Sequence, residues 1–373
     1  MRKIISVLTC GLLLWSLCAH AAAIGSNVSD IASAQKEAYG VSELESALPE
    51  EAYSAWGNIT VEDASHPQSL LEQLWETISG SSNELVTSAM QNAAMILLLC
   101  FVISVVQTLP LDGGQANVCG IVGAVSIALI CTREATACVP LGFHVMESLS
   151  SFSGRLLPAL CAAATAGGAL TSAGAKYAVS SLFLDLFITI MTQYLRPMLD
   201  LYIAAVIAGN VLQNEILLSV TSLFKRVLRV CLIGSAAAFT GYLTLTGVLS
   251  GSVDAAAAKA AKTTVSTVLP VVGGILSDAA GTIISGAGIL RSGIGSLGLL
   301  CVLAVSVIPY ASLGIHYLMY QLISGFTSSF SDKRISALLH GFSDVYAMLL
   351  GVVGTISFVM FASIVSLMRA VSG

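Results

Sequence analysis

Charge is what this sequence lacks most. Only 10% of the 373 residues are Asp, Glu, Lys or Arg, whereas a typical soluble domain carries about 25%. Hydrophobic residues make up 56%, and the mean hydropathy is +0.88. So few charges cannot cover a water-facing surface, which excludes soluble enzymes and disordered proteins. The net charge of −5 also argues against a nucleic-acid binder. What remains is an all-α polytopic membrane protein.

Catalytic and metal-binding motifs are also missing. There is no Gly-x-x-x-x-Gly-Lys-Ser/Thr loop and no His-Glu-x-x-His zinc motif. His144 and Glu147 lie one turn apart, which is more typical of a polar patch at the membrane surface than of a metal site. No Cys-x-x-Cys spacing occurs, so the cysteines are interpreted as small hydrophobic residues. We therefore expect no enzyme activity, no metal and no cofactor.

The distribution of charge divides the chain into three parts. Residues 1–23 resemble an export signal, with a basic start, a short apolar core and a small-x-small cleavage region at Ala19 and Ala21. Residues 24–91 contain one base (Lys36) and eleven acids, and the signal places them outside the cytoplasm. Residues 92–373 form the multi-span membrane domain.

The acidic segment is predicted to form short helices. Ser42-x-x-Glu45 and Ser69-x-x-Glu72 have the capping-box pattern of helix N-termini. An apolar stripe with helical spacing then follows: Leu70, Leu71, Leu74, Trp75 and Ile78. This stripe either docks a partner or packs against its own neighbours or the membrane surface, and the second interpretation is favoured.

Long uncharged stretches predict the membrane spans, because a charge at the bilayer centre costs about 3 kcal/mol. Six stretches are long enough for a helix of about 20 residues, at 85–111, 113–132, 156–175, 230–253, 292–331 and 345–368. The stretch 292–331 has room for two spans with a break near Pro309. Residues 177–224 add one or two spans with polar faces. We therefore predict six to eight transmembrane helices after a cleaved signal peptide.

Residues 254–291 are too polar and too rich in glycine for an ordinary span. They are interpreted as an interfacial helix followed by a broken or re-entrant element, which is tolerated at membrane depth only inside protein or next to water. The topology stays open at this point. An eight-span arrangement places the basic clusters at 225–229 and 333–334 inside, but leaves Lys259, Lys262 and Arg291 outside.

Charges within apolar sequence are the candidate functional residues. Asp185, Arg196 and Asp200 occur within sixteen residues of one another, and Arg196 and Asp200 have the spacing of neighbours on one helical face. Such charges usually face a bundle interior or a water-filled cavity. They either line a pore or transport path or form a structural ion pair. Asp278 in the Gly-rich element is a similar candidate.

Glycines predict close helix packing, because small residues let membrane helices approach one another. Gly247-x-x-x-Gly251 has the strict spacing, and Gly273, Gly274 and Gly281 begin a Gly-rich run that reaches Gly298. A tightly packed bundle or a self-associating protomer is expected.

Two stretches carry a resemblance to a known family: VLPVVGGILSDA at 268–279 and IPYASLGIHYLMYQL at 308–322. Together with the signal, the acidic segment and the multi-span region, they resemble the bacterial stage III sporulation protein AE family. The resemblance implies a protein of the mother-cell membrane that surrounds the forespore in endospore-forming bacteria. It also implies partners: a secretion-type ATPase, ring-forming proteins and a forespore-side protein. The family offers no catalytic residues to carry over.

The sequence and the resemblance together predict a non-catalytic membrane subunit of a secretion-like channel complex. This subunit acts as conduit or assembly platform and has no nucleic-acid partner. The alternative is an independent secondary transporter, which would be expected to show internal repeats and broken helices. A broken element is expected near 270–281, but no matching element occurs in the other half of the sequence.

Overall fold

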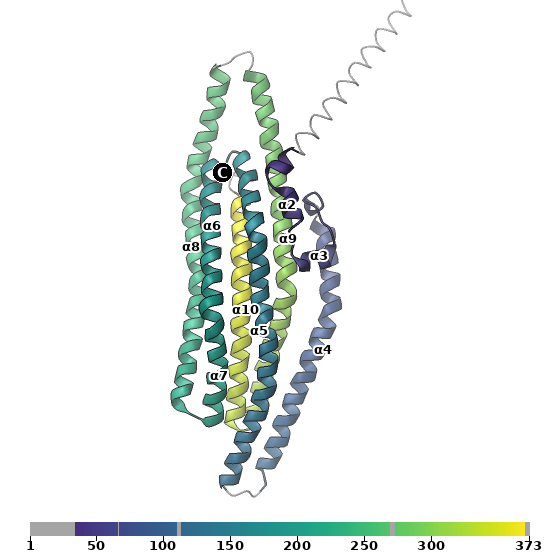
Figure 1. Cartoon of the computed structure of the whole chain (residues 1–373), viewed down its shortest axis with the longest axis vertical. Coiled ribbons are helices and arrows are strands. Elements are labelled where there is room, and N and C mark those ends of the chain that lie inside the picture. The colour runs from purple at the N-terminus through teal and green to yellow at the C-terminus, as the bar shows by residue number, and fades with distance from the viewer. Residues whose placement is uncertain (1–33, 66, 110–112, 269–272, 370–373) are drawn as a thin grey trace, which may run out of the picture.

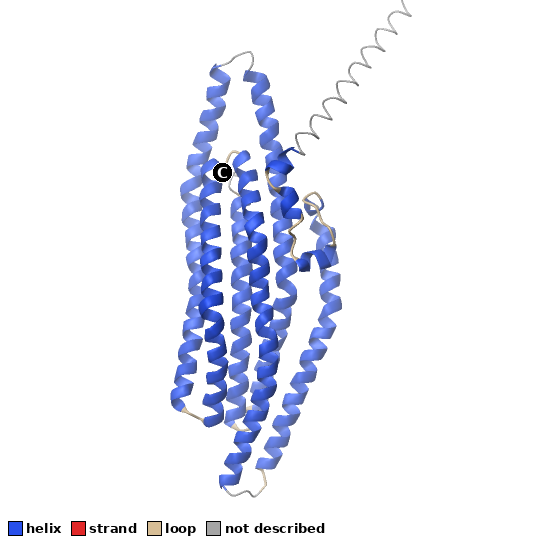
Figure 2. Cartoon of the chain, viewed as in Figure 1, coloured by secondary structure: helices blue, strands red, loops and turns tan. Residues whose placement is uncertain are grey.

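A computed structural model describes residues 34–65, 67–109, 113–268 and 273–369. These residues form helices joined by short turns, and no strand occurs among them (Figure 2). The prediction of an all-helical protein is therefore confirmed.

Residues 34–38 are helical, and two further short helices, a 3₁₀ turn and a set of long helices follow them. The short elements are α2 (Val41–Glu45), α3 (Glu50–Trp56) and η1 (Asp63–Ser65). The long elements are α4 (Pro67–Gln107), α5 (Gly113–Ala166), α6 (Leu170–Ile190), the π-helical turn η2 (Met191–Leu195), α7 (Arg196–Leu212), α8 (Glu215–Val268), α9 (Gly273–Thr327) and α10 (Lys333–Met368).

The long helices run up and down side by side in an elongated bundle (Figure 1). In chain order, α4, α5, the continuous α6–η2–α7 rod, α8, α9 and α10 pass along it. The turns α7–α8 and α9–α10 lie at one end, and α2, α3 and the end of α10 lie toward the other (Figure 1). The 54 residues of α5 rise about 81 Å, whereas a bilayer core is about 30 Å thick. The longest helices therefore extend well beyond a bilayer.

Five helical segments of the described residues are long and apolar enough to cross a membrane: Pro67–Gln107, Asn117–Ala166, Ser172–Leu212, Gly286–Thr327 and Lys333–Met368. The sequence predicted six to eight spans. The predicted span at 230–253 lies in α8, which is not among the five.

Two details of the predicted spans are wrong. The stretches 113–132 and 156–175 are not separated by a loop, because most of both lies in the single helix α5. The stretch 292–331 is not broken at Pro309, because α9 continues through it. Transmembrane helices tolerate an internal proline where neighbouring groups satisfy the freed carbonyl.

The Gly-rich element at 254–291 is helical on both sides of residues 269–272, which lie outside the described residues. Residues 254–268 continue α8 and residues 273–291 begin α9. Pro197, in the first turn of α7, does not interrupt the rod, because the π-turn η2 lies directly before α7 and the helix continues. A π-turn widens the helix there, which suits a proline that cannot donate a hydrogen bond to the preceding turn.

The acidic segment folds onto the side of the bundle. α2 packs on α5, and α3 packs on α4 and α9. Glu51 of α3 contacts His144 of α5 at 3.1 Å, so His144 pairs with this segment.

In the described loop before η1, the backbone N–H and the hydroxyl of Thr60 donate to Asp63. These hydrogen bonds hold the pKa of Asp63 below its usual value.

One side of the apolar stripe of the acidic segment packs against the protein itself, and Ile78 contributes to this packing. Leu70 and Leu74 are buried, whereas Leu71 and Trp75 are exposed. The predicted capping boxes are not formed, because α2 begins at Val41 after Gly40 and α4 begins at Pro67, two residues before Ser69. The Glu45 side chain instead accepts the N–H of Val61.

Candidate functional site

The interior of the bundle contains a polar seam between the antiparallel helices α9 and α10. At one level the hydroxyls of Ser306 and Ser357 are 2.6 Å apart. Further along, the Ser343 hydroxyl donates to Gln321 at 3.0 Å. The other members of the seam are Ser312, His316, Tyr320, Ser324, Ser336 and Tyr346.

Ionisable groups gather at the middle of this seam. The Tyr320 hydroxyl donates to Glu134 Oε2 of α5 at 2.6 Å. The Tyr346 ring lies 5.3 Å from the ring of His316 and 5.1 Å from that of Tyr320, between centroids. The buried Glu134 Oε1 has no hydrogen-bond partner among the described residues. Three helices therefore bring a carboxyl, an imidazole and two phenols together inside an apolar bundle.

A second polar cluster joins α7, α8 and α10. Lys225 of α8 forms a salt bridge with Asp344 of α10 at 2.5 Å. The Tyr202 hydroxyl of α7 is 3.3 Å from the same carboxylate oxygen and 3.4 Å from the Gly341 carbonyl. Tyr202 is 1% exposed, so this cluster ties the interior of the bundle to the partly exposed Lys225.

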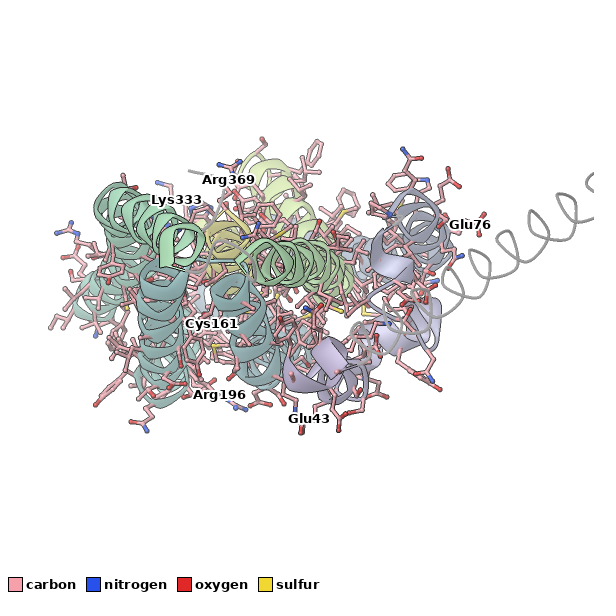
Figure 3. The ribbon with its side chains drawn as sticks, turned by 90° about the horizontal axis from the view of Figure 1, so that it is seen from above. Glu43, Glu76, Cys161, Arg196, Lys333 and Arg369 are labelled. Carbon is pink, nitrogen blue, oxygen red and sulfur yellow. The ribbon has the colours of Figure 1, made fainter. Side chains whose placement is uncertain are left out.

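The predicted pore residues lie elsewhere. Asp185, Arg196 and Asp200 are exposed on the outer side of α6 and α7, and Figure 3 shows Arg196 at the edge of the bundle. The salt bridges of the described residues do not join Arg196 and Asp200. The Arg196 guanidinium lies 5.4 Å from the centre of the Phe143 ring of α5. With Thr189 and Gln193, these residues form an outward stripe (Asp185, Thr189, Gln193, Arg196, Asp200).

The surroundings of the other predicted residues lie outside the described part of the chain. These residues are Asp278, Gly247, Gly251, Gly273, Gly274 and Gly281, with Ala19 and Ala21 of the predicted cleavage region. Close helix contacts are made by Gly298, the last residue of the predicted Gly-rich run, and by Gly123, which the sequence had not singled out. A Cβ atom on Gly298 of α9 would lie 2.7 Å from Leu156 of α5. One on Gly123 of α5 would lie 2.9 Å from Ile103 of α4.

Sequence reasoning missed the polar seam, although a signal was present. Ser312, His316, Tyr320 and Ser324 are each four residues apart, which places them on one face of a helix. Glu134 was not predicted as an intramembrane polar residue because it stands beside Arg133 at the end of an uncharged stretch.

The seam can act in two ways. Hydrogen bonds between membrane helices hold them together, and chains of Glu and His side chains inside a bundle can relay protons. Nothing in the seam forms a metal site, because no three His, Cys, Asp or Glu side chains gather as ligands among the described residues.

Comparison with known proteins supports one assignment. No curated protein and no solved structure matches the chain. The family model of stage III sporulation protein AE matches residues 61–371, which is most of the chain and includes both polar clusters and the outward stripe. The chain therefore belongs to the stage III sporulation protein AE family.

Proposed function

We propose that this protein is a non-catalytic integral membrane subunit of the channel complex between mother cell and forespore, acting as conduit or assembly platform. The family makes it a stage III sporulation protein. The observation that carries the finer proposal is the outward stripe on α6–η2–α7. Charged side chains that face lipid are costly, so the stripe calls for a neighbouring subunit or water. A bundle alone in the bilayer would have neither a neighbouring subunit nor water beside the stripe.

The proposed orientation follows from the two ends of the bundle. The basic residues Lys225, Arg226, Arg229, Lys333 and Arg334 follow the α7–α8 and α9–α10 turns, at one end (Figure 1). The acidic helices α2 and α3 lie toward the other end. Basic residues prefer the cytoplasmic side. We place the acidic segment between the two membranes, where it is available to a forespore-side partner, and the basic end in the mother-cell cytoplasm.

Affinity purification tests the proposal. Tagged protein from sporulating cells, extracted in mild detergent, should bring down the secretion-type ATPase and the ring-forming proteins, as identified by mass spectrometry. A matched purification from cells that express an unrelated tagged membrane protein controls for carry-over. Recovery of a clean homo-oligomer without those partners would contradict the proposal.

Cysteine labelling distinguishes conduit from platform. If the outward stripe faces water in the assembled complex, Asp185→Cys and Asp200→Cys should react with a water-soluble thiol reagent in intact membranes. Leu186→Cys and Leu201→Cys are matched controls, because these exposed apolar neighbours should face lipid and stay unreactive. Unreactive cysteines at all four positions in an intact complex would favour a dry interface, and therefore a platform.

The polar seam favours a second candidate, an independent secondary transporter. A buried carboxyl next to His316 and two tyrosines is suited to proton-coupled transport. Purified protein in liposomes should then dissipate an imposed proton gradient, and Glu134→Gln should stop it. The transporter candidate would be contradicted if the protein purifies with its sporulation partners and liposomes that contain it show no proton flux.

A further inference from the structure

A groove of about 840 Å³ runs between α8 and α10. It has the size of typical small-molecule sites. Its α8 wall extends from Lys225 to Thr244 and its α10 wall from Asp344 to Phe358. The groove is hollow because many of its lining residues are small, among them Ala236, Ala237 and Gly241 of α8 and Ala347 and Gly351 of α10.

The charges of the groove lie at one end. Lys225 is neutralised by its salt bridge with Asp344. Arg229, one turn further along α8, is exposed and belongs to none of the ion pairs formed by the described residues. Two bases and one acid leave a single positive charge there. The rest of the groove is lined by apolar side chains and a few threonines.

We propose that this groove binds an anionic phospholipid of the bilayer. The phosphate lies against the Arg229 guanidinium, with Lys225 beside it, and an acyl chain follows α8 past Leu232, Ile233 and Ala237. From Arg229 to Thr240 the helix rises about 17 Å, close to half of a bilayer core of about 30 Å. One leaflet's acyl chain therefore matches the apolar part of the groove in length.

The position of the charge favours a lipid over a free anion or a second protein helix. Basic pockets between membrane helices on the cytoplasmic side bind acidic headgroups, and Arg229 lies toward the basic end of the bundle. A free phosphate would use the charged end but not the long apolar wall. A neighbouring apolar helix would use the wall and leave the Arg229 charge without a partner. A phospholipid with one negative charge pairs with the charged end of the groove and also fills its apolar wall.

Lipid titration of the full chain tests the charged end. Delipidated protein in a zwitterionic detergent is titrated with phosphatidylglycerol or phosphatidylcholine, and bound lipid is counted by native mass spectrometry. Phosphatidylglycerol should bind more tightly, and Arg229→Gln should weaken it about fivefold, the typical contribution of one basic residue near a membrane surface. Arg226→Gln is the matched control. Arg226 is exposed three residues away on the same helix and does not line the groove, so its variant should bind normally.

A second pair of variants tests the apolar wall without removing a charge. Ala237→Trp should fill the groove and abolish phosphatidylglycerol binding. Ala238→Trp should leave binding unchanged, because Ala238 is exposed but does not line the groove. If the Arg229 variant does not fold, this pair still decides the question.

Three results would overturn the proposal. The first is equal affinity for the anionic and zwitterionic lipids. The second is equal effects within either matched pair, since the lipid would then bind elsewhere. The third is displacement of the lipid by inorganic phosphate alone, which would indicate a simple anion site. None of these results depends on the partners recovered from sporulating cells, so the two proposals fail independently.

Discussion

Gly341→Ala is expected to destabilise the bundle by about 1–3 kcal/mol, the usual cost of overpacking a close-packed interior. Gly341 lies where α10 crosses α7. A Cβ atom there would come into steric conflict with the Cγ1 atom of Val206 and would lie 3.1 Å from its Cγ2 atom. Val206 is 1% exposed, and a β-branched side chain on a helix has little freedom to turn away. The two helices would have to separate, which would also disturb the hydrogen bond between the Tyr202 hydroxyl and the Gly341 carbonyl.

Gly325→Ala is the matched control for this prediction. Gly325 also lies within a long helix, but it is exposed and no atom lies within 4 Å of the position of its Cβ. Alanine favours a helix over glycine by about 1 kcal/mol, so the control should be neutral or slightly stabilising. Thermal unfolding in detergent, followed by circular dichroism or aggregation, measures both variants. Equal unfolding midpoints for the two would contradict the close contact between α7 and α10.

The fold class and the family were predictable because they depend on composition and on local motifs. The low charge and the long apolar stretches required membrane helices, and the stretches at 268–279 and 308–322 resembled the family to which the chain belongs. The boundaries were less predictable. Uncharged stretches locate bilayer-length segments, but they do not show whether the residues between two segments form a loop. Between 132 and 156 the charged residues were interpreted as the end of a span, yet α5 continues through them.

The face on which a polar residue lies was also not predictable from its charge alone. Asp185, Arg196 and Asp200 drew attention because they interrupt apolar sequence, and the structure places them on the outside of the bundle. The buried cluster is built on Glu134 and Tyr320, which come from helices far apart in the sequence. The four-residue spacing along α9 marked a polar face, but only tertiary packing shows which helix supplies the carboxyl that meets it.

Tyr320→Phe is expected to destabilise the bundle by about 1–3 kcal/mol, because it removes the hydrogen bond to Glu134 and leaves a buried acceptor unsatisfied. The double variant Tyr320→Phe/Glu134→Leu should recover most of this loss, since neither polar partner then remains. Tyr310→Phe is the control, because Tyr310 lies on the same helix but is half exposed. Unfolding midpoints of the parent protein and the three variants measure the loss and its recovery. Equal losses in the single and double variants would show that packing, and not the hydrogen bond, is what Tyr320 provides.

Glu134→Gln separates the two roles of the polar seam. Glutamine keeps an oxygen that accepts the hydrogen bond of the Tyr320 hydroxyl, but its amide group does not titrate. If the seam only holds α5 and α9 together, the variant should match the parent protein in both unfolding midpoint and spore yield. If the carboxyl moves protons, spore yield should fall while the midpoint stays unchanged. A fall in both would show that the carboxyl group itself is needed for a stable bundle, and would leave the structural role as the sufficient explanation.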